Sequence, residues 1–450
     1  MNDQGRVPTT RKDRFIAKLV DLLVRAIYRD VQVYWPVPPP LGGPQLTVAN
    51  HFGGFADGLV LLYALPRRPG IVARDLIWKV PVVGRLMTWL GGIPVHKPED
   101  GAEASANDQM FGSCYAALRG GGHLLIFPEG VTRNEPSIAT VKTGAARIAL
   151  GARASGAEGL VVAPVGIHYE DKAALRSRVV VNVGLPLDLD EAVDEYTGSD
   201  ASVDVNPLDA DNRAAVRDLT DGIDMMLRQA APDYADWREA RALTAGADIA
   251  LRDHIDDPRK PVPIALRDRL ANVLASRSPE RRARIIEAVE DYRSDLDALG
   301  VSDADVRARL STGGLMVSLV LQVIAAVLVL PFAVAGALIN VVPALIVKVA
   351  DLMRLSPSMK ATVKPAAAIV AFGITWGLVV WAGFEWLGLG GAAAAIILLP
   401  VYLAAVIVLA ERLALIWRLI RRWRAGGKTR NVERQLDEER AAVVEAVLGP

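Results

Sequence analysis

The chain has 450 residues, of which 52% are hydrophobic and 23% are charged. Its 51 lysines and arginines equal its 51 aspartates and glutamates, which argues against a nucleic-acid-binding protein, because such proteins normally carry a basic excess. A single cysteine, Cys114, excludes an internal disulfide and a cysteine-based metal site. Most of the charge precedes residue 312 and the apolar excess follows it, so the sequence predicts an integral membrane protein with a large soluble head.

Residues 1–40 are expected to form an amphipathic, membrane-proximal segment. A helix is predicted over residues 14–30, where apolar side chains recur near helical spacing and lysine and arginine occupy other positions. Such a helix can lie in the membrane interface. It can equally well dock as an ordinary helix on the next domain, and the sequence leaves both interpretations open.

Residues 41–190 alternate short apolar runs with helical patterns, and this alternation predicts an α/β layered domain. Short apolar runs bounded by turn residues are typical of buried strands. The expected strands are residues 46–49, 122–127, 159–164 and 179–183, and the expected helices lie near residues 57–66, 103–119 and 143–155. Residues 191–310 then form a helical extension, which begins with an acidic stretch that we interpret as a linker.

Two apolar stretches within residues 311–411 predict transmembrane helices. The first, residues 311–347, has no charged residue and is longer than the roughly 20 residues that one helix needs to span a membrane. It also contains two prolines, which favour bends. The second, residues 365–410, carries only Glu385, which lies beside a glycine-rich segment that we interpret as the turn of a helical hairpin.

Basic residues dominate both the loop between these stretches and the tail over residues 412–450. Since short basic segments favour the cytoplasmic side of a membrane, each apolar stretch must then enter and return. We therefore expect two helical hairpins in the cytoplasmic membrane, the first kinked or shallow, with the head and the tail in the cytoplasm. Three spans with a tilted first helix are the alternative. The lack of paired charges along these stretches argues against a transporter.

A first polar cluster follows the predicted strand 46–49. Asn50 and His51 come directly after this strand, at the sheet edge where open α/β sheets commonly bind their substrates. Asp57 can reach the imidazole only if the intervening backbone turns, and Gly53 and Gly54 allow such a turn. A carboxylate on one ring nitrogen fixes the tautomer and leaves the other nitrogen as a base. Taken alone, however, a histidine near an aspartate is more often structural.

A second polar cluster follows the predicted strand 122–127. It contains Glu129, Gly130 and Arg133; the glycine allows close backbone approach to a ligand, and the guanidinium offers a bidentate fork for a phosphate. Lys142 precedes a predicted helix, and a helix N-terminus also favours an anion. Two polar clusters at strand ends of one domain are difficult to explain by packing, so they predict a site for an anionic substrate.

Four segments, in this order and spacing, resemble the motifs of the glycerolipid acyltransferase superfamily. They are NHFGGFAD, GGIPVHK, FPEGVTR and APVGIHYEDK, and the resemblance covers roughly residues 20–190. Two further segments, LRSRVVVNVGLPLDL and DNRAAVRDLTDGIDMMLRQ, are most similar to the branch that acylates glycerol-3-phosphate or dihydroxyacetone phosphate. The usual superfamily spacing is His-x4-Asp; the His-x5-Asp spacing found here occurs in that branch.

The resemblance implies a membrane-bound enzyme of phospholipid biosynthesis that uses no cofactor and no metal. It would move a fatty acyl group from acyl-CoA or an acyl-carrier protein directly to the acceptor hydroxyl, with His51 as general base and Asp57 orienting it. The residues that would organise the acceptor and its phosphate are Lys97, Glu129, Gly130 and Arg133. Further candidates are Asn50, Lys142 and Pro164, the last shaping the acyl-chain side.

Some positions depart from the family pattern or stay unassigned. Lys97 stands where arginine is common, and an ammonium gives a point charge without a planar fork. His96 and His123 are more typical of strand or loop residues than of ligands. The residues also leave alternatives open: the same chemistry on lysophosphatidate or another lysophospholipid, or a non-catalytic membrane scaffold that keeps an acyltransferase-like head.

Overall fold

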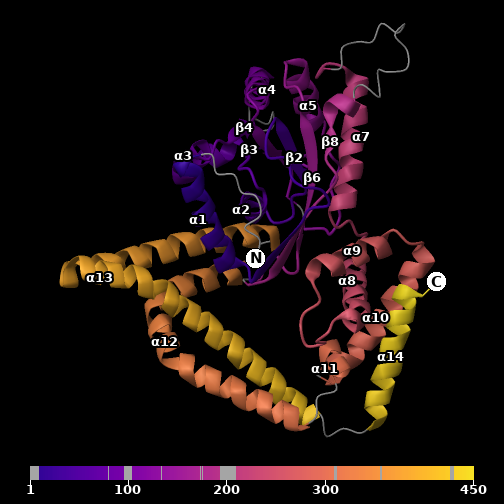
Figure 1. Ribbon diagram of the computed structural model, residues 1–450, viewed down its shortest axis with the longest axis vertical. Helices are drawn as coiled ribbons and strands as arrows, with labels where there is room; N and C mark the ends of the chain where they lie inside the picture. Colours follow the sequence, from indigo (N-terminus) through magenta and orange to yellow (C-terminus); the bar gives the residue numbers. More distant parts are fainter. Residues whose placement is uncertain are drawn as a thin grey trace. The chain divides into compact units, whose positions relative to one another are not determined.

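The computed structural model describes residues 10–79, 81–95, 104–132, 134–172, 174, 176–192, 209–299, 301–308, 312–354, 357–425 and 430–449. Contacts divide the chain into two compact units, the first formed by residues 1–236 with 357–361 and the second by residues 237–356 with 362–450. The first unit contains the sheet, and the second contains a helical bundle and two long apolar helices (Figure 1).

The first unit is built on an eight-stranded mixed sheet, with strand order β1-β7-β6-β2-β5-β3-β4 and β8 paired to β6. The strands are β1 (Asp30–Tyr34), β2 (Gln45–Ala49), β3 (Gly70–Arg74), β4 (Ile93–Val95), β5 (His123–Ile126), β6 (Val161–Tyr169), β7 (Arg178–Val183) and β8 (Leu187–Asp188). β2 runs parallel to both β5 and β6, so the carboxyl ends of these three strands meet at one edge. The predicted α/β fold is confirmed.

Helices cover both faces of this sheet (Figure 1). They are α1 (Arg11–Ile27), α2 (Phe55–Ala64), α3 (Pro81–Trp89), α4 (Ala104–Arg119), α5 (Gly144–Ala154) and α7 (Arg213–Ala230), with a short 3-10 helix at Asp75–Lys79. Apolar residues of α4, α5 and α7 pack on one face, and those of α1 and α2 pack on the other. α7, which the sequence placed within residues 191–310, thus lies with the sheet through Ile223 and Leu227.

α1 presents two apolar surfaces. Four residues at helical spacing are buried against α2 and the sheet: Ile16, Val20, Val24 and Ile27. The Thr10 side chain caps the helix by accepting a hydrogen bond from the Asp13 backbone N–H at 3.1 Å. Phe15, Leu19 and Leu22 remain exposed. The sequence left open whether this helix lies in the membrane interface or docks on the next domain. The structure shows it docked, with a second apolar surface still exposed.

The second unit contains a bundle of short helices that closes around aliphatic side chains. Its elements are α8 (Trp237–Leu251), a 3-10 turn (Arg252–His254), α9 (Ile264–Ala275), α10 (Pro279–Leu299), α11 (Asp303–Ala308) and α14 (Arg430–Leu448). Leu243, Ile285, Val289 and Val443 are fully buried where α8, α10 and α14 pack together. Gly246 in α8 allows this approach, because a Cβ there would lie 3.1 Å from Val289 and 3.2 Å from Val447.

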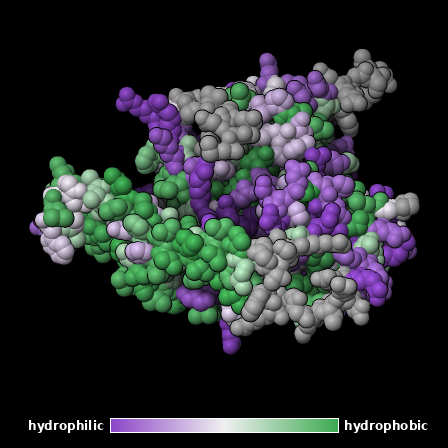
Figure 2. All heavy atoms as spheres, turned by 60° about the horizontal axis from the view of Figure 1, so that its bottom comes forward, coloured by the Kyte–Doolittle hydropathy of each residue, from purple (hydrophilic) through white to green (hydrophobic). Residues whose placement is uncertain are grey.

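Two long apolar helices, α12 (Thr312–Leu352) and α13 (Pro357–Ala425), follow α11 in the chain. Their segments Met316–Leu352 and Ala366–Trp417 are long and apolar enough to cross a membrane. Most of their side chains are exposed, unlike those of a core helix, and Figure 2 shows apolar residues gathered over them. An exposed apolar surface of this length indicates association with a membrane.

The structure forms only the second of the two expected hairpins. α13 reverses at Gly388, whose φ of 63° and ψ of −154° are not helical and are accessible mainly to glycine. The two arms pack against each other directly next to the turn, since a Cβ on Gly383 would lie 2.8 Å from the Gly391 carbonyl oxygen. The first stretch is one continuous helix, without the turn that would divide it into two antiparallel helices. Pro331 and Pro343 are accommodated within α12, because a proline removes one helical hydrogen bond without forcing a turn.

Candidate active site

Asn50 fixes the end of β2 against β6. It is fully buried, its Nδ2 donates to the Ile167 carbonyl at 3.0 Å, and its Oδ1 accepts from the Ile167 N–H at 2.7 Å. Both halves of the amide are therefore used by the backbone of the neighbouring strand. Asn50 holds the chain in place for the next residue, His51.

His51 and Asp57 form a hydrogen-bonded pair at this sheet edge. Their Nδ1 and Oδ2 atoms are 2.9 Å apart, and the aspartate is completely buried. The turn between them depends on glycines: Gly54 has a φ of 65°, and a Cβ on Gly53 would lie 2.8 Å from Asp57 Oδ1. Because a carboxylate only accepts hydrogen bonds, Nδ1 carries the proton and Nε2 presents a lone pair.

The imidazole is held in one orientation but is not sealed. Its ring stacks on the Phe127 ring with the centroids 4.2 Å apart, and its side chain is 21% exposed. Among the residues that the structure describes, Nε2 has no hydrogen-bond partner. A fixed imidazole with an accessible lone pair can accept a proton from a substrate hydroxyl.

Glu129 ties two loops of the site together. Its Oε1 accepts from the His51 backbone N–H at 2.7 Å, and its Oε2 accepts from the Ala139 N–H at 2.8 Å. Burial raises the pKa of the Glu129 carboxyl, while these two hydrogen bonds act in the opposite direction. Both carboxylate oxygens accept hydrogen bonds from backbone N–H groups. Glu129 therefore positions the backbone of His51 and Ala139.

Gly130 and Lys142 lie together at the rim of the same edge. Gly130 has a φ of 65° and donates to the Phe127 carbonyl at 3.0 Å, which closes the turn after β5. A Cβ on Gly130 would lie 3.2 Å from Lys142 Nζ, so the absence of a side chain lets the ammonium lie over the loop. Lys142 is exposed and supplies a cation for an anionic ligand.

The remaining predicted residues are not gathered here. Lys97 and Arg133, with His96, lie outside the described residues. Pro164 is on the face of β6 opposite to Val165, Ile167 and Tyr169, and its ring lies 2.8 Å from where a Cβ of Gly184 would be. Within the described part of the chain, no group of three or more histidine, cysteine or acidic side chains could hold a metal ion.

Tyr169 is a site residue to which the sequence assigned no role. Its hydroxyl donates to Asp57 Oδ1 at 2.7 Å, and its ring lies beside that of Tyr28, with the centroids 5.9 Å apart. Burial and the charge of Asp57 raise the pKa of Tyr169 well above its ordinary value, so the phenol stays protonated as a donor. The alternation of side chains along β6 could have identified this residue. Tyr169 is on the same face of β6 as Val165, and Val165 pairs with Ala49, two residues before His51.

Asp57 thus receives three donors. Gly53 N–H and His51 Nδ1–H reach Oδ2, at 2.8 and 2.9 Å, and the Tyr169 hydroxyl reaches Oδ1. Lys172 adds a nearby positive charge, donating to the Phe52 carbonyl at 3.2 Å. Burial lowers the pKa of Lys172, although Asp57 acts to raise it. A buried carboxylate with three donors, one of them the imidazole itself, is well placed to stabilise a protonated imidazole.

His123 is a structural residue, as expected. It begins β5, lies 2.8 Å from Thr47 Oγ1 and 3.1 Å from the Arg67 carbonyl oxygen, and is buried. Burial and the nearby Arg67 lower the pKa of His123 to about 3, so it remains neutral near pH 7. It pairs β2 with β5 and takes no part in the polar cluster around His51.

Residues 30–168 match the family model described as Acyltransferase. That segment contains every strand from β1 to β5 and nearly all of β6, together with His51, Asp57 and Glu129. The chain therefore carries an acyltransferase domain of the glycerolipid acyltransferase superfamily, and the family resemblance drawn from the four motifs is confirmed.

The chain is similar to one curated protein and to one solved structure of acyltransferases. Glycerol-3-phosphate O-acyltransferase 2 of Saccharomyces cerevisiae is 28% identical over 212 residues, which cover 46% of this chain and 26% of that protein. The chain thus spans about a quarter of the length of the curated relative it matches. Among solved structures, the 1-acyl-sn-glycerophosphate acyltransferase PlsC from Thermotoga maritima is 17% identical, covers 48% of this chain and 81% of its own, and gives a TM-score of 0.31.

Proposed function

We propose that this protein transfers a fatty acyl group from an acyl thioester to a hydroxyl of glycerol-3-phosphate, or of dihydroxyacetone phosphate, in phospholipid biosynthesis. The observation that carries the proposal is the His51–Asp57 pair at 2.9 Å, set at a sheet edge with Nε2 accessible. The acceptor is suggested by the relative from yeast, which is a glycerol-3-phosphate O-acyltransferase.

In this mechanism, Nε2 of His51 accepts the proton of the acceptor hydroxyl as the oxygen attacks the thioester carbonyl. Asp57 stabilises the imidazolium that forms, and the hydrogen bonds from Gly53 and Tyr169 keep the carboxylate in position. When the tetrahedral intermediate collapses, the carbon–sulfur bond breaks and the imidazolium returns the proton to the departing thiolate. No acyl-enzyme forms, so no nucleophilic serine or cysteine is required.

The acceptor phosphate requires fixed cations. Lys142, beside Gly130 at the rim, and Lys172, which donates to the Phe52 carbonyl, are two candidates for these cations. Lys97 and Arg133 complete the phosphate site in this proposal, on the strength of the family resemblance alone. Glu129 acts by holding the His51 backbone rather than by touching the phosphate.

The reaction takes place at the cytoplasmic membrane, with the acyltransferase domain facing the cytoplasm and acyl-CoA or an acyl-carrier protein as donor. This location is supported by the two long apolar helices and by the basic residues around them. The exposed Phe15, Leu19 and Leu22 of α1, interspersed with basic residues, would bring the domain to the same surface.

The test uses the purified full chain in detergent or bilayer discs with labelled palmitoyl-CoA. Glycerol-3-phosphate, dihydroxyacetone phosphate and lysophosphatidate are compared as acceptors for the wild type, for His51→Ala and for His254→Ala, which changes an exposed histidine in the bundle. We expect labelled lysophosphatidate from the wild type and His254→Ala, and none from His51→Ala.

Product from lysophosphatidate alone would keep the chemistry and change the acceptor. Equal activity of His51→Ala and the wild type would refute the assignment of the base. If no acceptor is acylated, with acyl-carrier-protein donors also supplied, the enzymatic function is wrong and a membrane scaffold is the better explanation.

A further inference from the structure

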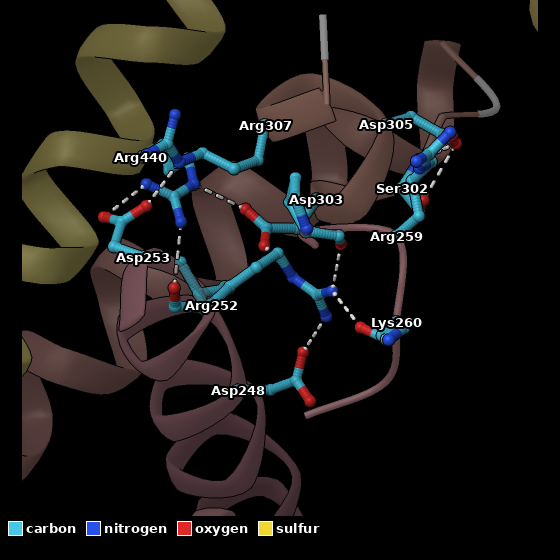
Figure 3. Close-up of polar contacts among 12 residues, drawn as sticks. Asp248, Arg252, Asp253, Arg259, Lys260, Ser302, Asp303, Asp305, Arg307 and Arg440 are labelled. Carbon is cyan, nitrogen blue, oxygen red and sulfur yellow. Dashed lines mark hydrogen bonds and ion pairs between the residues drawn. The ribbon is translucent and has the colours of Figure 1, made fainter. Parts of the chain in front are cut away.

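The helical bundle of the second unit is closed by α14, which comes after both apolar helices in the chain. Arg440 of α14 binds Asp303 Oδ1 at 2.8 Å, Asp253 Oδ2 at 2.9 Å and the Ile249 carbonyl at 2.9 Å (Figure 3). Arg252 binds the other oxygen of Asp303 at 2.7 Å. Arg252, Asp303 and Arg440 are buried, so this network joins α14 firmly to the helices that precede α12.

This packing constrains the path of the chain through a membrane. Helices α8 to α11 precede α12, and α14 follows α13. Since α14 packs against α8 and α10, the chain leaves the membrane on the side from which it entered. The number of complete crossings between α11 and α14 is therefore even.

α13 accounts for two crossings. Its arms, from residue 365 to Gly388 and from there to residue 410, each extend about 33–36 Å at 1.5 Å per residue, and a hydrocarbon core is about 30 Å thick. Glu385 and Trp386 lie at the turn and are exposed, as suits a loop at the far interface. A third crossing by α12 would place α14 on the wrong side.

α12 does not follow a straight path beside these arms. Its first half contacts the second arm: Arg412 donates to Gln322 at 2.8 Å, and a Cβ on Gly336 would lie 2.3 Å from the Tyr402 carbonyl oxygen. Its second half contacts the first arm through two hydrogen-bonded pairs of side chains. Trp376 Nε1 donates to Asn340 Oδ1 at 2.9 Å, and Lys364 donates to Asp351 at 2.9 Å.

The contacts of α12 therefore pass from one arm of α13 to the other between Gly336 and Asn340. This point lies between Pro331 and Pro343, which weaken the helix on both sides of it. Each end of α12 lies beside a base of the α13 hairpin, and its centre lies between the arms. α12 is a bent helix nested inside the hairpin.

The bend lies about halfway along the arms. Trp376 is 12 residues before Gly388 and Tyr402 is 14 residues after it, which places the bend about 18–21 Å from the turn. The side chain of Asn340 is buried at this depth, and its Nδ2 donates to the Gly336 carbonyl at 2.8 Å. A polar group in the hydrocarbon region has to be satisfied inside the protein, and Asn340 is.

We propose that α12 is a re-entrant helix, which enters the membrane to about its middle and returns, while α13 is a hairpin that crosses twice. The acyltransferase domain, the bundle, the end of α12 at Met353 and α14 all lie on one side of the bilayer. The inference holds whether or not the chain transfers acyl groups, so it is tested without measuring activity.

Labelling of single-cysteine variants shows on which side of the bilayer each position lies. Cys114 is fully buried, so the wild type should react with a membrane-impermeant maleimide only after unfolding. Four exposed positions are replaced one at a time in sealed membrane vesicles of both orientations: Met225→Cys, Met353→Cys, Glu385→Cys and Glu438→Cys. We expect Met225→Cys, Met353→Cys and Glu438→Cys to react from one side, and Glu385→Cys from the other.

Met353→Cys reacting from the side opposite to Met225→Cys would show that α12 crosses, and would overturn the proposal. So would Met225→Cys and Glu438→Cys reacting from opposite sides, or Glu385→Cys reacting only on the side of Glu438→Cys. Depth is measured separately with a nitroxide on Leu338→Cys, at the exposed side of the bend. We expect the oxygen accessibility of the bilayer centre there; accessibility typical of the surface would show that α12 lies flat.

Discussion

Two buried polar clusters in this molecule are similar in composition and different in what they leave open. In the bundle, the carboxylate of Asp303 accepts from Arg252, Arg440 and Tyr292, and all four of these side chains are buried. At the sheet edge, Asp57 likewise accepts three hydrogen bonds, but one of its donors, His51, has an exposed edge and an unused nitrogen. Both carboxylates accept a full set of hydrogen bonds, so a buried, hydrogen-bonded carboxylate alone does not identify a catalytic site. The accessible Nε2 of His51, which can accept a proton, is what distinguishes the cluster at the sheet edge.

Asp57→Asn gives the largest expected effect and tests the open cluster. An amide carries no negative charge to stabilise the imidazolium, and its NH2 group must face either the Tyr169 hydroxyl or the N–H donors of Gly53 and His51. We therefore expect acyl transfer to fall by about 10²–10⁴, as in other histidine–carboxylate pairs. Labelled-product formation measures it. Asp21→Asn, which removes an exposed carboxylate from α1, is the control and should keep full activity. Equal rates for both variants would contradict the proposed role.

Arg440→Leu tests the closed cluster. Removing the guanidinium leaves Asp303 buried with fewer partners, and breaking such a pair costs about 3–5 kcal/mol. We expect hydrogen exchange in α14 and α10 to accelerate, with little change in acyl transfer by the intact acyltransferase domain. Arg434→Leu on the same helix removes an exposed pair and should change exchange very little. Unchanged exchange in Arg440→Leu would mean that apolar packing alone holds α14.

Tyr169→Phe separates positioning from packing in the open cluster. It deletes the hydrogen bond to Asp57 Oδ1 but keeps the ring, at a stability cost of about 1 kcal/mol. Without this hydrogen bond the carboxylate is less well positioned for the imidazole, so we expect kcat to fall about tenfold with KM unchanged. The negative charge of Asp57 is then shared with one donor fewer, which favours the imidazolium, so the acid limb of the pH–rate profile should move to higher pH. Tyr28→Phe changes a hydroxyl that does not hydrogen-bond to Asp57 itself, so it should have a weaker effect. A loss of stability with an unmoved profile would indicate packing only.

Asp253→Asn gives the smallest expected effect. Burial alone would raise the pKa of Asp253, but Arg440 and Arg307 hold it below its ordinary range. A carboxyl with a lowered folded-state pKa stabilises the fold above its unfolded pKa of about 3.9, and loses this contribution as the pH falls through the folded value. Wild type and variant should differ by less than about 1 kcal/mol at pH 7. In thermal unfolding, the difference should shrink as the pH falls below about 4 and vanish below the folded-state pKa. A difference that persists in acid would exclude the ion pair as its source.

The sequence predicted those features that depend on local pattern. The strand before His51, the glycine turn to Asp57 and the hairpin at Gly388 each follow from a few adjacent residues, and the structure contains all three. The contact of Tyr169 with Asp57 was missed because it joins residues 112 positions apart, and only strand pairing brings them together. For α12, the prolines predicted a kink in the first stretch, but they could not predict where it lies, because its place is set by contacts with α13.

The position of Arg440 has a consequence for how the protein is made. Arg440 is 137 residues from Asp303 in the chain, and both membrane helices are synthesised between them. At about 5–20 residues per second, the nascent bundle waits on the order of ten seconds before α14 leaves the ribosome. Until then Asp303 lacks one guanidinium, and Val289 and Ile285 lack the cover that α14 gives. Completion of the bundle therefore reports that α12 and α13 have already been synthesised, and a chain that stops short of α14 keeps an exposed apolar surface that chaperones and proteases recognise.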